Sequence, residues 1–260
     1  MDSLKQILQS SGIACADWDV LTSTDRGDIL FFTSAGGKSA IDLWQQLMDL
    51  AGRTKHWPVL LGEEEDIANH RELSEMNNGL IQETLDFANK IEVPSWFALK
   101  EAERLEDFKK YNPGEDPANF LTPVGDWPDS IMPSNNFFTP FDTLSRKPLA
   151  RIVMGLIPTT ICWESPAFLR LGGWNECPDA ALHCAVQKYW QQQYDAVIVA
   201  ATHDVVEMKV RRPPMTREAA MKLAKEQFIY CQDIVEQGTQ TLSRLAAGLL
   251  NGSAWFFWWD

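Results

Sequence analysis

A thiol, an imidazole and two carboxylates are the residues of this chain best suited to catalysis. Cys177 stands directly before Pro178, a favoured first helical residue, so its thiol is expected near the positive end of a helix, where thiol pKa values fall. His183 follows, and Asp204 or Glu207 could orient its ring in a Cys-His-acid site of a cysteine-dependent hydrolase. However, the spacing of Cys177 and His183 puts them on different helix faces, and no oxyanion-hole motif accompanies them. We therefore favour a structural thiol beside a packed histidine.

Metal binding is the second chemistry that these residue types allow. Ligands could come from Cys177, His183, Cys184 and Cys231, joined by Asp233, if the fold brought two helices together. Zinc sites usually show closely spaced ligand pairs, whereas the adjacent His183 and Cys184 point about 100° apart on a helix. No metal and no other cofactor is therefore expected.

A glycine-rich turn carries the first candidate binding residues. The sequence Gly172-Gly173-Trp174-Asn175-Glu176-Cys177-Pro178 places a large ring and a side-chain amide just before a predicted helix. Trp174 and Asn175 could floor a pocket for a small ligand or a peptide.

A polar stripe near the end of the chain carries the other candidates. Glu226, Tyr230 and Asp233 recur at helical spacings of four and three residues, which places them on one side of a helix. A structural charge network with nearby arginines is the favoured interpretation, and a binding pocket is the alternative. The arginines in question are Arg211, Arg212 and Arg217.

These residues must be positioned by a mixed set of strands and helices. We predict strands over residues 151–157, 160–163, 196–201 and 205–210, and a helix over 179–193. The intervening Thr202-His203-Asp204 is short enough for an antiparallel hairpin. A helical stripe from Thr216 to Leu249 predicts one long C-terminal helix, with a possible break near Gly238.

The first 148 residues read as two parts. A strand at 28–33, a helix at 38–51 and a strand at 57–62 predict a βαβ-like unit, with parallel pairing if both strands share a sheet. Residues 63–148 are acidic and helical to about residue 110, then rich in proline and aromatic residues, and we expect an ordered elaboration.

The predicted fold class is α/β (α+β), with a mixed sheet that contains an antiparallel hairpin and is covered by helices. The expected division is 1–62, 63–148 and 149–260, with the first and third parts forming one compact unit. The final Trp255-Phe256-Phe257-Trp258-Trp259-Asp260 is expected to pack into the core as a last strand or plug, and a partner-binding surface is the alternative.

Composition limits the classes of partner. The chain has 260 residues, 45% of them hydrophobic, with a net charge of −13, and residues 1–150 carry 25 acidic against 13 basic side chains. Such a field disfavours nucleic acid and anionic membranes and favours a basic protein partner. Five scattered cysteines without CxxC pairs, and no apolar leader or span, predict a cytoplasmic protein with reduced thiols.

Several motifs in a fixed order resemble the bacterial family called domain of unknown function 4253. The resemblance is close over residues 150–260 and looser at Trp57-Pro58-Val59-Leu60-Leu61-Gly62. Its motifs are Gly173-Trp174-Asn175, Cys177-Pro178, His183, Arg212-Pro213-Pro214, Ala224-Lys225-Glu226-Gln227, Tyr230-Cys231, Asp233-Ile234-Val235, Gln237-Gly238 and the aromatic end. The family implies no established activity; members are similar to components found near bacterial toxin–immunity loci.

Two functions from different classes follow. The first is a non-catalytic protein-binding module, of the immunity or adaptor type, whose acidic part captures a basic partner. The alternatives are a cysteine-dependent hydrolase using Cys177 and His183, and a small-ligand-binding domain. The first explains the charge asymmetry and needs no catalytic set, so it is the function that the sequence favours.

Overall fold

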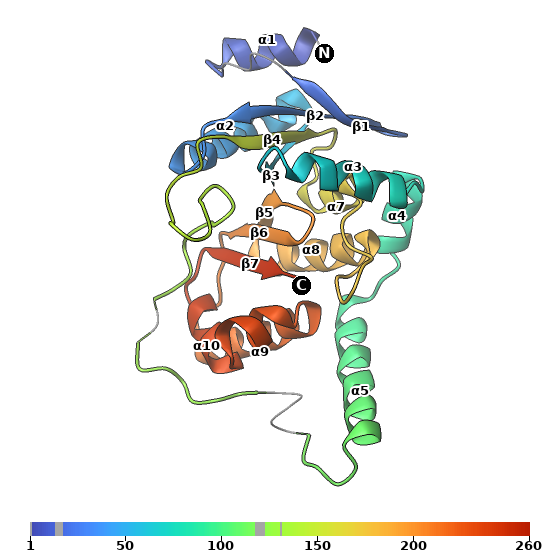
Figure 1. The fold of residues 1–260 in the computed structure, drawn as a ribbon, viewed down its shortest axis with the longest axis vertical. Helices are drawn as coiled ribbons and strands as arrows, with labels where there is room; N and C mark the ends of the chain where they lie inside the picture. Colours follow the sequence, from blue (N-terminus) through green and yellow to red (C-terminus); the bar gives the residue numbers. More distant parts are fainter. Residues whose placement is uncertain (1, 14–17, 118–122, 131) are drawn as a thin grey trace.

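A single seven-stranded mixed sheet organises the protein, in the order β1-β2-β4-β3-β5-β6-β7 (Figure 1). The computed structural model describes residues 2–13, 18–117, 123–130 and 132–260, so Cys15 lies outside the described residues. The strands are β1 (Asp19–Thr24), β2 (Gly27–Ser34), β3 (Trp57–Gly62), β4 (Ile152–Ile157), β5 (Ala196–Ala201), β6 (Val205–Val210) and β7 (Ala254–Trp258). The predicted mixed α/β fold and its hairpin, β5 with β6, are confirmed.

The centre of the sheet is buried on both faces. All residues of β3, β4 and β5 are buried, as expected for near-continuous apolar runs that are covered by helices. The strand β4 lies between β2 and β3 and is antiparallel to both, while β3 and β5 are the parallel neighbours. The strands on either side of α2 are thus parallel but not adjacent, because a strand from much later in the chain separates them.

Helices pack on this sheet and beyond its β7 edge. They are α1 (Asp2–Ser10), α2 (Lys38–Thr54), α3 (Asp66–Met76), α4 (Ile81–Ala88), α5 (Val93–Tyr111), α7 (Ser165–Leu169), α8 (Ala180–Tyr194), α9 (Arg217–Tyr230) and α10 (Leu242–Leu249). Figure 1 shows α9 and α10 beyond β7 and α5 standing beside them. No helix in the described part of the chain is both long and apolar enough to cross a membrane.

The predicted strand at 160–163 is wrong. Cys162–Glu164 form a short 3-10 helix that leads into α7. The Thr159 hydroxyl donates to the Glu164 carboxylate at 2.6 Å and accepts the N–H of Ile161 at 3.1 Å. These local hydrogen bonds form a turn at the position where strand pairing was predicted.

The predicted long C-terminal helix is also wrong. The helix α9 ends at Tyr230, a π-helical turn follows at Ile234–Thr239, and α10 is separate. The chain leaves the helix because Cys231 adopts an extended conformation and its thiol donates to the Trp258 carbonyl at 3.0 Å. The hydrophobic stripe continues past this break, which explains why it resembled one helix.

A segment of the proline-rich region is fastened over the last two strands. Both carboxylate oxygens of Glu207, which is fully buried on β6, accept backbone N–H groups, from Phe138 at 2.6 Å and Thr139 at 3.0 Å. The carbonyl of Ser134 accepts the N–H of Ala254 at 3.0 Å. We call residues 134–139 the strap.

The aromatic end of the chain is the last strand of the sheet. The strand β7 pairs with β6, and Trp255, Phe257 and Trp259 on one face are buried. On the alternate face, Phe256 is exposed and Trp258 is partly exposed, while Ala254 is buried. The end therefore packs as a final strand, and its second face remains open to contacts.

Candidate functional site

The glycine-rich turn forms a compact loop over the start of α8. Gly172 has φ 76°, and a Cβ there would lie 1.6 Å from the carbonyl oxygen of Pro178 and 2.8 Å from His183 Nε2. The N–H of Gly173 is within hydrogen-bond distance of the carbonyls of Cys177 and Pro178. Only glycine at position 172 lets the loop close this tightly, and the closure seals the imidazole below it.

Beneath this loop, Cys177 and His183 meet, contrary to the prediction from helix faces. The Cys177 Sγ lies 3.5 Å from His183 Nε2, and His183 Nδ1 hydrogen-bonds the Tyr230 hydroxyl. The prediction failed because α8 begins at Ala180, so Cys177 belongs to the loop and folds back over the helix. The edges of Tyr230 and Trp259 pack around the imidazole.

The protonation states of this pair oppose nucleophilic catalysis. Burial raises the pKa of the Cys177 thiol, reinforced by Cys231 and Asp204, so the expected lowering at a helix end is wrong. Burial lowers the pKa of His183 to about 3, against a weaker effect of the Pro178 carbonyl. A reactive cysteine needs a thiolate beside a cation, whereas this pair is neutral at pH 7 and buried, with Cys177 6% exposed and His183 fully buried. The cluster therefore fits a structural role.

The proposed metal ligands do not form a site in the described residues. No group of three or more histidine, cysteine, aspartate or glutamate side chains there is arranged to hold an ion. Cys184 is fully buried in α8, and burial raises the pKa of Cys231 to about 12 while its thiol donates to a backbone carbonyl. Both thiols are therefore neutral and used in packing.

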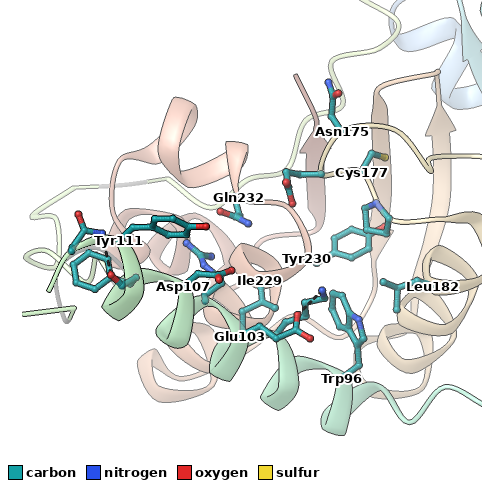
Figure 2. A pocket seen from close by; sticks show the side chains of 16 residues that line it. Trp96, Glu103, Asp107, Tyr111, Asn175, Cys177, Leu182, Ile229, Tyr230 and Gln232 are labelled. Carbon is teal, nitrogen blue, oxygen red and sulfur yellow. Dashed lines mark hydrogen bonds and ion pairs between the residues drawn. The ribbon is translucent and has the colours of Figure 1, made fainter.

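A large cleft lies on one side of the loop, between α5 and the start of α8 (Figure 2). It has a volume of about 720 Å³, and Figure 2 shows Trp96 and Tyr111 at its ends, with Asn175 and Cys177 across from α5. Its basic residues are already paired, Lys100 with Glu103 at 2.8 Å and Arg104 with Glu236 at 3.6 Å. The cleft therefore offers no unpaired basic side chain among its described lining residues, while Asp107 and Glu176 add carboxylates.

A different cavity lies on the other side of the loop, at one end of the sheet. Two hollows of about 420 and 700 Å³ share His203, Asp204 and Trp258, and we call them together the acidic groove. Carboxylates line both hollows, namely Glu63, Asp66, Glu72, Asp204 and Asp260. Besides His203, Arg146 is the basic residue among the lining side chains, and its guanidinium stacks on Phe138.

The centre of the groove is built from two turns that follow parallel strands. Asp66 begins α3 after β3, and His203 and Asp204 lie in the turn after β5. His203 Nδ1 lies 3.4 Å from Asp66 Oδ1 and 3.5 Å from Asp204 Oδ1. The carboxyl ends of parallel strands are the usual place for a ligand in such sheets. The glycine that ends β3, Gly62, has φ 93°, and a Cβ there would overlap the Asp66 carboxylate.

Burial, together with neighbouring negative charges, raises carboxylate pKa values at this end of the sheet. Burial raises the pKa of Glu63, and the negative charges of Glu65, Asp66 and Asp142 raise it further. Burial also raises the pKa of Asp66, against the N–H of Glu63 and His203, which lower it. A positive charge placed in the groove would relieve this repulsion.

The predicted stripe of Glu226, Tyr230 and Asp233 does not form one site. The Glu226 carboxylate accepts hydrogen bonds from Tyr189 and Trp190, Tyr230 faces His183, and Asp233 accepts the N–H of Asp260 at 3.0 Å. The expected arginine pairing is wrong as well. Arg211 pairs with Asp195, Arg212 donates to the Gln192 carbonyl, and Arg217 stacks on Trp127.

The remaining candidate residues lie in different parts of the structure and do not form one site. Glu207 is buried under the strap, while Asp204 lies in the turn before β6, where Thr202 donates to it at 2.8 Å. Trp174 lines the acidic groove and Asn175 lines the α5 cleft, so they do not floor one pocket. Sequence reasoning missed Asp66, Glu72 and Trp258, although polar residues directly after predicted strands were a usable signal for Asp66.

One family model matches the last 108 of the 260 residues. Residues 153–260 match the family described as Domain of unknown function (DUF4253). The DUF4253 match begins inside β4, so it includes the loop, the buried His183 and the β7 end. It leaves out β1 to β3 and the helices α1 to α5. No curated protein and no solved structure matches the chain.

Proposed function

We propose that this protein is a non-catalytic binding module that holds a basic segment of a partner protein in the acidic groove. The observation that carries this proposal is the groove's composition. Five carboxylates line two adjoining hollows in which Arg146 and His203 are the basic residues. Complementary charge of this kind guides encounter and selects a cationic partner.

The walls of the groove suit arginine in particular. Trp258 is partly buried and lines both hollows, and Trp174 lines the smaller one. A guanidinium can stack on an indole ring while it donates to a carboxylate, which a strongly hydrated ammonium does less well. Asp204 lines both hollows beside Trp258, which supports this combination.

The two hollows also fit an extended segment better than a compact ligand. They meet at His203, Asp204 and Trp258, so neighbouring side chains of one strand-like segment could enter one hollow each. An immunity-type or adaptor role is the biological form that we propose for this binding. The buried, neutral state of Cys177 and His183 supports binding over hydrolysis.

The test uses a fluorescein-labelled octapeptide of alternating arginine and alanine, followed by fluorescence anisotropy. The groove variant is Glu63→Gln with Glu72→Gln, two exposed lining carboxylates. Two charge pairs of about 0.7 kcal/mol each predict a roughly tenfold loss of affinity. The matched control, Glu83→Gln with Glu106→Gln, removes the same charge from exposed helix positions and should change affinity less than about twofold.

A second variant separates the ring from the charge. Trp258→Leu keeps the net charge and an apolar side chain but removes the indole, so it should weaken the arginine peptide more than a lysine peptide of the same length. Equal weakening by the groove and control variants would refute the proposal, because the binding would then follow net charge alone.

A further inference from the structure

We propose that a separate hollow at the outer edge of β7 binds the carboxylate of a small apolar acid. This hollow has a volume of about 270 Å³ and lies between β7, the π-helical turn and α10. Its walls are mostly apolar, with Ile234, Leu245, Leu249, Trp255, Phe256 and Trp258 among the lining residues. The proposal is independent of the acidic groove, because different polar groups carry it.

The first donor is the backbone of Phe256. In the pairing of β7 with β6, the backbone groups of residues 253 and 259 point toward β6. The carbonyl of Ser253 accepts the N–H of Val210, and the N–H of Trp259 donates to the carbonyl of Asp204. In an antiparallel strand the backbone N–H and C=O groups of alternate residues point in opposite directions. The backbone groups of residues 254, 256 and 258 therefore point to the outer edge of the sheet. No described residue accepts the N–H of Phe256.

Three outward groups on either side of this position are satisfied. The N–H of Ala254 donates to Ser134, the carbonyl of Trp258 accepts the Cys231 thiol, and the N–H of Asp260 donates to Asp233. The unpartnered N–H of Phe256 thus lies in a gap between covered stretches of the edge, and the hollow occupies that gap.

Two side chains add donors to the same hollow. Gln227 lines it and is 1% exposed, and its Nε2 has no hydrogen-bond partner among the described residues. An unpaired buried N–H is costly, so an oxygen that reaches it is bound favourably. The exposed guanidinium of Arg244 also lines the hollow, and it forms no ion pair with a described residue.

The lining acid does not compete for these donors. Both oxygens of Asp233 are already engaged, one with Asp260 and the other with Gln237. The lining side chains therefore offer the unpartnered Gln227 amide and the Arg244 guanidinium, and an anionic oxygen pair with an apolar body is the complementary ligand. The volume is slightly below the range of about 300 to 1,000 Å³ that ligand pockets usually have, which limits the body to a short chain or one ring. A π-helical turn in the wall is also a feature often found at functional sites.

The test uses octanoate as the probe and 1-octanol as its uncharged counterpart, with isothermal titration calorimetry of the full chain. Gly248→Leu fills the hollow, because Gly248 lines it and a Cβ there meets no atom within 4 Å. Gly52→Leu is the matched control, since Gly52 is also helical and a Cβ there also meets no atom within 4 Å. We expect octanoate affinity to fall at least about tenfold in Gly248→Leu and to stay unchanged in Gly52→Leu.

A charge variant keeps the test decisive if the filled hollow disturbs folding. Arg244→Gln changes an exposed side chain and should weaken octanoate while leaving 1-octanol binding unchanged. The proposal is overturned if wild-type protein shows no octanoate binding, or if octanoate binds the Gly248→Leu or Arg244→Gln protein as tightly as wild type. Loss of the arginine peptide in the acidic groove would not bear on these outcomes.

Discussion

The buried histidine beneath the glycine loop should make the fold sensitive to mild acid. Burial lowers the pKa of His183 to about 3 in the folded protein, while the unfolded chain keeps a value near 6.5. A lowered folded pKa means that the unfolded state binds more protons, so stability is fully present above pH 6.5 and is lost as the pH falls toward 3. Between pH 7.5 and 5.0 this linkage costs about 2 kcal/mol for His183 alone.

The measurement is the free energy of unfolding in urea, followed by circular dichroism at both pH values, for wild type and His183→Gln. Wild type should lose about 2 kcal/mol more than the variant over this range. The result is the difference between the losses of the two proteins, because other groups that titrate over this pH range affect both of them. His70 has a pKa lowered to about 4 and adds a similar acid penalty, whereas burial raises the pKa of Glu207 and of Glu226, which favours the fold as pH falls.

A matched variant checks the assignment. His70→Gln should remove its own share of about 2 kcal/mol between the same pH values, and the double variant should remove both shares. If His183→Gln and wild type lose the same stability on acidification, the imidazole is not held neutral in the fold and the reasoning from burial is wrong.

Three other outcomes follow from the described contacts. Peptide mapping after brief alkylation of native protein should show Cys177 modified far more slowly than after denaturation, because its pKa is raised by burial; equal rates would contradict a sealed loop. Glu207→Ala should cost about 3 kcal/mol and speed proteolysis within the strap, since two backbone N–H groups lose a charged acceptor, while Asn136→Ala, on the exposed side of the strap, should do neither. In thermal melting, Gly172→Ala should lower the free energy of unfolding by more than about 3 kcal/mol, because its Cβ would overlap Pro178. Gly173→Ala should lower it by about 1 kcal/mol, because a Cβ there meets nothing within 4 Å. Similar losses for the two variants would show that the loop is not tightly closed.

Much of the local structure followed from sequence because it depends on neighbouring residues. Short apolar runs predicted β2, β3 and the hairpin of β5 with β6, and periodic stripes predicted α2 and α8. By contrast, β1 (Asp19–Thr24) was missed, because it is a largely polar outer strand in which Leu21 is the buried side chain. The place of β4 in the sheet was also beyond reach, since strand order is set by contacts distant in sequence.

Two residues of the acidic groove were singled out from the sequence, whereas Asp66, Glu72 and Trp258 were missed and the geometry of the groove was not predicted. Asp204 and Trp174 were both singled out, but their joint presence in one groove depends on how two turns and the chain end meet. Cys177 and His183 were instead expected on different helix faces and are in contact. The error arose because helix-face reasoning was applied to Cys177, which lies before the helix. The broken C-terminal helix has the same origin, since a hydrophobic stripe records which residues are buried and not whether the backbone is continuous.

The insertion of β4 between β2 and β3 has a consequence for any attempt to dissect the chain. During synthesis, β2 and β3 leave the ribosome 118 and 90 residues before the strand that joins them, so their facing edges stay open until then. A fragment cut at the boundary of the DUF4253 match would keep β5, β6 and β7 but lose β3, leaving β4 without its neighbours. Exposed apolar edges of that kind promote self-association, so the excised fragment should be recovered as aggregate unless residues 1–62 are supplied in trans.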